Sequence, residues 1–258
     1  MPFSDWCDVA EEDVGDHSLI TLAARAADLE VGCDATALCI PSHYASEERM
    51  AELLRRLGKS AAARFIEQKL PESSRIRSGD LGEIFATEYI SERLIFTVPI
   101  KRLRWKDHRE MAMRGDDVLA VHLPDDDESP ILFLKAESKS RAALQSSVIA
   151  EARTSLNADS GLPSPHALSF VADRLREIGE AELSDIIDDA QLKEGIVADQ
   201  VCHMLFVLSG TNPTNLLRNE LQQYAGTIEQ YSVGLQVANH GQFIQDVYDT
   251  VIANGDDD

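Results

Sequence analysis

Two short apolar runs, each joined to acidic residues, constrain the fold of this chain more than any other feature. Residues 118–121 are Val-Leu-Ala-Val and follow Gly-Asp-Asp at 115–117. Residues 131–134 are Ile-Leu-Phe-Leu and lead into Glu-Ser-Lys at 137–139. Runs of this length and apolar content are typical of buried strands. If the two strands are neighbours in one sheet, both sets of carboxylates come to a shared edge.

The rest of the chain alternates between helical and strand patterns. The spacing of apolar residues predicts helices at 46–70 with a break at Gly58, and at 79–93, 142–156, 165–193, 215–224 and 242–253. Strands are predicted at 36–40, 94–104, 117–123, 131–139, 202–208 and 231–237, with an acidic hairpin connection at 124–130. This order predicts an α/β fold in which helices flank a mixed central β-sheet.

The length of 258 residues allows one large domain or a main domain with an appendage. The polar segment 71–78 predicts a boundary near residue 75. Residues 1–75 are then an acidic, mostly helical N-terminal extension, and residues 76–258 form the main domain. The start lacks a signal-peptide pattern, no apolar run is long enough for a membrane span, and the four cysteines form no Cys-x-x-Cys pair. We therefore expect a cytoplasmic protein with no membrane partner.

Charge is distributed unevenly along the chain. The formal net charge of −21 argues against binding of free nucleic acid, because such proteins usually have a basic face. Residues 101–114, however, hold six basic and two acidic side chains around Trp105, an aromatic that could stack on a base. A solvated basic strand and turn explains this segment equally well, and a more basic partner could deliver DNA to it. The candidate DNA contacts are Lys101, Arg102, Arg104, Lys106, Arg114 and, on the helix after the third strand, Gln145.

The Glu-x-Lys tripeptide at 137–139 is distinguished by its position in a strand. Residues two apart in a strand share a face, so Glu137 and Lys139 point the same way. The chain has a second Glu-x-Lys at 67–69, but it lies in a predicted helix, where residues two apart do not face each other. The face that holds Glu137 changes from apolar to charged along the strand, which suits a strand that leaves the core and enters a cleft.

These residues predict a site for a divalent metal. Mg²⁺ prefers oxygen ligands and lowers the pKa of a bound water. Asp117 and Glu137 are the predicted ligands, with the Ser138 carbonyl as a third, and Lys139 is predicted to orient the water or stabilise the transition state. Asp116 ranks below Asp117 because the strand register points it the other way. Two exposed strand ends joined by a salt bridge are the structural alternative.

Glu83, in the segment 79–83 (Gly-Asp-Leu-Gly-Glu), is a candidate further metal ligand. A capping box between Asp80 and Glu83 at a helix start is an equally good explanation. Gly82 favours a functional role, because glycine inside a helix costs about 1 kcal/mol relative to alanine. The missing side chain would let DNA or a neighbouring strand come close.

The ordered set Glu83, Asp117, Glu137 and Lys139 resembles the PD-(D/E)xK nuclease superfamily. More narrowly, about residues 75–145 resemble the nuclease subunit of the Hachiman antiphage defence system, although no proline precedes the aspartate. The resemblance implies a restriction-endonuclease-like core and a DNase that uses Mg²⁺, with Mn²⁺ as an alternative ion. It also implies a superfamily 2 helicase partner that feeds the nuclease or restrains it until phage DNA damage or processing is sensed. The acidic residues 1–75 would be the region that docks this partner.

Two other functions remain open at this point. The strong acidity also suits a non-catalytic regulatory or binding subunit that retains the nuclease fold. A phosphoesterase acting on nucleotides or RNA would need similar metal ligands.

Overall fold

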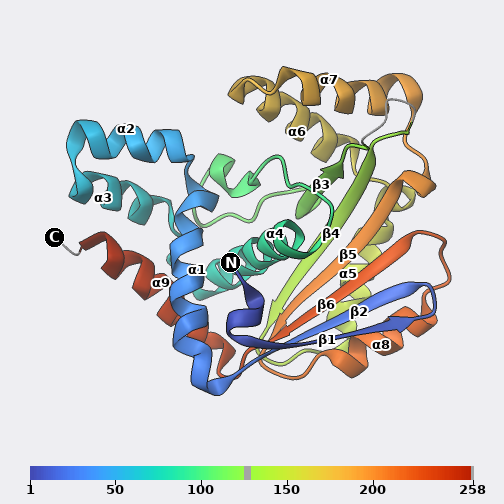
Figure 1. The fold of residues 1–258 in the computed structure, drawn as a ribbon, viewed down its shortest axis with the longest axis horizontal. Coiled ribbons are helices and arrows are strands. Elements are labelled where there is room, and N and C mark those ends of the chain that lie inside the picture. The colour runs from blue at the N-terminus through green and yellow to red at the C-terminus, as the bar shows by residue number, and fades with distance from the viewer. Residues whose placement is uncertain (125–128, 257–258) are drawn as a thin grey trace.

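A six-stranded mixed sheet forms the centre of the molecule (Figure 1). The computed structural model describes residues 1–124 and 129–256, so the middle of the predicted hairpin connection at 124–130 lies outside the described residues. The spatial order is β1-β2-β6-β5-β4-β3; the four inner strands are parallel neighbours, and an antiparallel strand closes each edge. The predicted α/β class with a mixed sheet is confirmed. The strands are β1 (Cys7–Val14), β2 (His17–Ala24), β3 (Val118–His122), β4 (Leu132–Arg141), β5 (Val201–Ser209) and β6 (Glu229–Gln236).

Helices cover both faces of the sheet. Helix α4 lies across one face with α1 and α9 packed beside it, while α5 and α8 cover the other (Figure 1). Helices α6 and α7 pack over the β3–β4 end. None of the helices in 1–124 and 129–256 is long and apolar enough for a membrane crossing. Their bounds are α1 (Leu29–Tyr44), α2 (Glu47–Leu57), α3 (Lys59–Lys69), α4 (Ser74–Arg93), α5 (Ser146–Asn157), α6 (Pro165–Ile178), α7 (Ala181–Asp189), α8 (Thr214–Gln223) and α9 (His240–Asp256).

The N-terminal residues contain two strands that were not predicted from the sequence. Residues 7–24 form β1 and β2, and β2 pairs in parallel with β6. The edge strand β1 exposes most of its side chains, so it lacks the alternation of a half-buried strand. Strands from both sides of the predicted boundary at residue 75 therefore share one sheet.

Two predicted strands are absent from the described structure. Residues 94–104 make a single bridge, from Thr97 to Val121, and end in a 3₁₀ turn at Arg102–Trp105. Pro99 interrupts this segment, and proline cannot donate to a strand ladder. Residues 36–40 are helical in α1, where Cys33, Ala37 and Ile40 are buried at helical spacing. The predicted break at Gly58 is confirmed: its φ of 83° ends α2 and precedes α3.

Candidate active site

Helix α4 comes unusually close to β4 at one point. The helix begins at Ser74, with Ser73 as its N-cap, so the alternative of a capping box between Asp80 and Glu83 is wrong. Gly82 is therefore an interior helix residue. A Cβ on Gly82 would lie 3.2 Å from Ser138 Oγ, which is tighter than ordinary contact. The glycine permits the close approach of the strand, and the next residue, Glu83, comes to the edge of the sheet.

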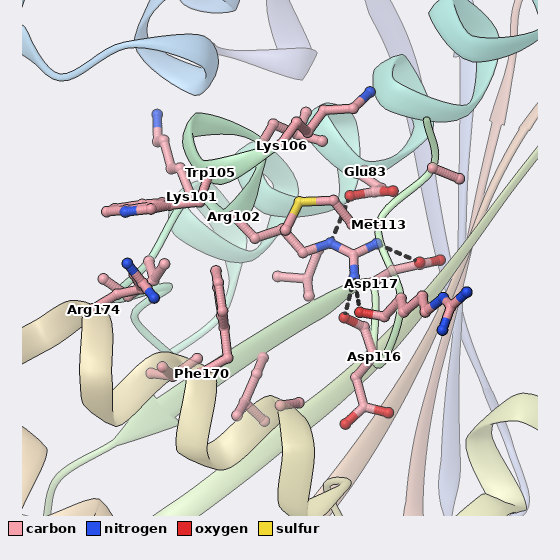
Figure 2. A pocket seen from close by; sticks show the side chains of 18 of the residues that line it. Glu83, Lys101, Arg102, Trp105, Lys106, Met113, Asp116, Asp117, Phe170 and Arg174 are labelled. Atoms are coloured by element: carbon pink, nitrogen blue, oxygen red, sulfur yellow. Dashed lines mark hydrogen bonds and ion pairs between the residues drawn. The ribbon is translucent and has the colours of Figure 1, made fainter. Parts of the chain in front are cut away.

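The two neighbouring aspartates have separate partners. The Ser138 N–H donates to Asp117 Oδ2 at 2.9 Å, which fixes this carboxylate beside β4. Asp116 instead accepts from the Ser164 N–H at 2.8 Å and lies 3.6 Å from the buried ammonium of Lys135. Asp116 thus joins β3 to the start of α6, and its carboxylate points away from Glu83 (Figure 2). This placement favours Asp117 as the site residue.

Glu137 and Lys139 lie together on one face of β4. The Lys139 ammonium is 2.8 Å from Glu137 and 3.0 Å from Glu151 of α5. Since Val118 pairs with Ala136, continuing the register brings Asp117 opposite Glu137. Burial and the nearby charge of Asp117 raise the pKa of Glu137 to about 7 despite the lysine.

Arg102 lies between two of the predicted metal ligands. Its guanidinium donates to Glu83 Oε2 at 2.8 Å and to Asp117 Oδ1 at 2.8 Å (Figure 2). It also donates to the Asp116 carbonyl at 2.7 Å, and its side chain is only 10% exposed. From the sequence, Arg102 was a candidate DNA contact. In the structure its N–H groups donate to carboxylates and backbone carbonyls of the protein itself.

The predicted ligands do not form a closed metal cage in this arrangement. Among the residues in 1–124 and 129–256, the trio close enough to hold one ion is Cys39, His43 and Glu88, rather than Glu83, Asp117 and Glu137. Burial raises the pKa of Glu83 to about 7 even though Arg102 opposes the shift. Burial thus disfavours the ionised form of these carboxyl groups, and a cation beside them favours it. Carboxylates held in this way are suited to a hard divalent cation.

The Cys39–His43–Glu88 trio was not anticipated, although Cys39 and His43 stand four residues apart on one helix. Its polar groups already have partners: His43 is 2.8 Å from Glu88, and Lys101 is 3.2 Å from the same carboxylate. Burial lowers the pKa of His43 to about 4, so the ring is neutral at physiological pH. Burial works against ionisation of Glu88, but bonds from His43 and Lys101 lower its pKa to about 2. The trio is therefore a satisfied internal network between α1 and α4.

The predicted DNA contacts differ in accessibility. Lys106 is 4% exposed and pairs with Asp80 at 2.7 Å, so its ammonium is not available as a surface contact. Arg104 donates to the Ser42 carbonyl at 2.8 Å. Most cations of this segment thus contact acceptors within the protein, which leaves fewer of them free to contact DNA than the sequence suggests. Arg114 and Gln145 are exposed.

A cavity of about 580 Å³ opens beside Arg102 and the two carboxylates that it contacts. The rings of Trp105 and Phe170 meet edge to face across it at 6.2 Å, perpendicular to one another. The Arg174 guanidinium lies 5.5 Å from the centre of the Phe170 ring (Figure 2). Phe170 and Arg174 come from α6 and were not predicted, since a lone aromatic in an amphipathic helix looks like a core residue.

Comparison with known proteins supports the resemblance to a Hachiman subunit at the level of the protein family. The HamA family model matches residues 1–251. The Hachiman protein HamA of Bacillus cereus is 30% identical over 184 residues, which are 71% of this chain and 64% of that relative. The aligned part thus spans less than two thirds of the relative's length. Because the family match extends over almost the entire sequence, the chain belongs to the HamA family.

Proposed function

We propose that this chain is a metal-dependent DNA nuclease with a PD-(D/E)xK-type core that acts in antiphage defence with a helicase partner. The observation that supports it most directly is the grouping at one sheet edge. Asp117 is bonded to the backbone of Ser138, Glu83 reaches the same edge from α4, and Glu137 stands beside Lys139. Membership in the HamA family supports the defence role.

The donor set fits Mg²⁺ or Mn²⁺. The carboxylates of Glu83, Asp117 and Glu137, with the Ser138 carbonyl, supply oxygen ligands of the kind that Mg²⁺ prefers. Arg102 supports this fit, because it occupies a cation position between two of these carboxylates. A bound ion would lower the pKa of a water and neutralise charge on the scissile phosphate.

The protein's own residues have distinct roles in this proposal. Lys139, on the same face as Glu137, orients the attacking water and stabilises negative charge that develops on the phosphate. Glu137 and Glu151 hold the Lys139 ammonium in place, at 2.8 and 3.0 Å. The hydrogen bond from Ser138 to Asp117 keeps the ligands in register.

Incubation with DNA tests the proposal. The purified chain is mixed with supercoiled, linear and single-stranded DNA in Mg²⁺ or Mn²⁺, alone and with its helicase partner. We expect cleavage that EDTA stops. If every DNA form stays intact in all mixtures, the nuclease proposal fails.

The rival function is a non-catalytic regulatory subunit, and the position of Arg102 favours it. A site permanently neutralised by arginine would need no metal. Calorimetry discriminates the two: the nuclease takes up Mn²⁺ in a manner that Asp117→Ala abolishes, whereas the regulatory subunit takes up none at this site.

We expect Trp105→Ala to weaken binding of single-stranded DNA by about tenfold, since one stacked base contributes about 1–3 kcal/mol. The ring lines the cavity beside the carboxylates, where an unpaired base can stack. Fluorescence anisotropy with a labelled oligonucleotide and EDTA measures the change without cleavage.

Trp105→Phe is the matched control, because it keeps an aromatic face and should lose little affinity. Trp6, the other of the two tryptophans, is fully buried, so quenching of tryptophan emission by DNA reports on Trp105. Wild-type affinity in Trp105→Ala would contradict the stacking role.

A further inference from the structure

We propose that Arg102 is an internal counter-cation that the metal must displace, so that the free chain binds metal weakly until Arg102 moves. This inference rests on the proposed function, since it concerns the same carboxylates. Arg102 would thereby control how readily a metal reaches Glu83 and Asp117.

The hydrogen bonds of Arg102 provide the first support. Two different guanidinium nitrogens contact Glu83 and Asp117, each at 2.8 Å. Both oxygens accept bonds from the same guanidinium, so a cation that contacts both of them would compete with Arg102 for its position. Two cations at one position repel strongly, and Arg102 and a metal are therefore alternatives.

The burial of Arg102 provides the second support. The side chain is 10% exposed, and the carbonyls of Asp116 and Arg114 accept further bonds at 2.7 and 3.4 Å. Charge-assisted bonds of this kind are stronger than neutral ones, especially where water is excluded. Displacement of Arg102 therefore carries a free-energy cost, which lowers the apparent affinity for metal.

The surroundings allow the side chain to move without unfolding. Arg102 begins the short turn Arg102–Trp105, and Leu103 anchors this turn in the core at 4% exposure. The cavity of about 580 Å³ is lined by Arg102 itself, which gives the guanidinium a place to move into. There it faces the space in which the DNA phosphate of the proposed function would lie.

A coupling between metal and DNA follows. A phosphate that pairs with the released guanidinium replaces the bonds lost to Glu83 and Asp117. Metal and DNA then favour the same position of Arg102, so each raises the affinity for the other. This arrangement would keep the metal site closed in a chain without substrate.

The experiment is a calorimetric titration with Mn²⁺ in the absence of DNA. We expect Arg102→Ala to bind Mn²⁺ at least about tenfold more tightly than wild type, a difference of about 1.4 kcal/mol. Arg114→Ala is the matched control: it removes one positive charge from the same segment, but Arg114 is exposed. Its Mn²⁺ affinity should stay within about twofold of wild type, because it donates to neither carboxylate.

A short phosphorothioate oligonucleotide tests the coupling. The oligonucleotide should raise the Mn²⁺ affinity of wild type and leave the Mn²⁺ affinity of Arg102→Ala almost unchanged. Arg102→Lys, which keeps the charge but not the two-pronged geometry, should show intermediate affinity. If Arg102→Ala is poorly folded in EDTA, its melting temperature should rise more on adding Mn²⁺ than that of wild type.

The outcomes separate this inference from the proposed function. Equal Mn²⁺ affinity in wild type and Arg102→Ala, with binding lost in Asp117→Ala, overturns the counter-cation while the metal site stands. Absence of Mn²⁺ binding in every variant overturns both. Tighter binding in Arg102→Ala without cleavage of any DNA supports the counter-cation and overturns the nuclease.

Discussion

Replacing Glu137 with glutamine should reduce metal-dependent DNA cleavage by about a thousandfold and leave the protein folded. The substitution removes one proposed ligand, and a metal contributes several kcal/mol of transition-state stabilisation, with each 1.36 kcal/mol equivalent to about tenfold in rate. Stability should be unchanged or slightly higher. Burial and Asp117 raise the pKa of Glu137, so its charged form is less favourable in the folded protein than in the unfolded chain. A neutral glutamine avoids this cost.

The matched control is Glu67→Gln, in the other Glu-x-Lys of the chain. Glu67 is exposed on α3, and the change should alter neither cleavage nor melting temperature. Lys139→Ala should also lose cleavage, by about a hundredfold or more, because it removes a group that orients the water. Initial rates on plasmid DNA measure both effects. Cleavage by Glu137→Gln at the wild-type rate would remove this residue from the site.

Asp80→Ala should be the most destabilising single substitution among the residues discussed, by about 3–5 kcal/mol. Asp80 and Lys106 have side chains that are each 4% exposed, and they pair at 2.7 Å. The Tyr44 hydroxyl also donates to Asp80, at 2.6 Å. Removing the carboxylate leaves a buried ammonium without its counter-charge and takes one of two partners from the Tyr44 hydroxyl, the other being the Tyr248 hydroxyl. Urea denaturation measures the loss of unfolding free energy.

The double variant Asp80→Ala with Lys106→Met separates charge from packing. It removes both charges, so it should recover a large part of the lost stability. A double variant as unstable as Asp80→Ala alone would show that shape, rather than the unpaired charge, causes the loss. Both variants keep Glu83 and Glu137 in place, so Mn²⁺ binding reports whether the site survives.

Prediction from sequence succeeded where one pattern dominates a segment. The strands β3 and β4 are apolar runs with short connections, and both were recognised. The apolar content of 94–104 predicts a strand, but Pro99 interrupts the segment and one bridge forms. The edge strand β1 was missed because its exposed acidic side chains hide any alternation. Helix α1 was missed because several of its buried residues, such as Gly32, Cys33 and Ala37, are small and give a weak apolar pattern.

The site was predicted in part. Register alone favoured Asp117 over Asp116, and the structure brings Asp117 towards Glu83 and directs Asp116 to α6. The position of Arg102 could not be predicted, since several cations of that segment are equivalent in sequence. Which one faces the carboxylates depends on the direction of a short turn. Local sequence does not determine that direction.

The parallel pairing of β2 with β6 has a consequence for synthesis. Ser18 pairs with Tyr231, so the sheet joins an early segment of the chain to a late one. At about 5–20 residues per second, the ribosome finishes β2 many seconds before β6 emerges. Until then β2 has no partner on the side that β6 later occupies, and Leu19 and Leu22, which are buried in the complete fold, lack part of the core that covers them. A chain that ends before residue 229 would lack β6, and β2 would have no strand to join it to β5.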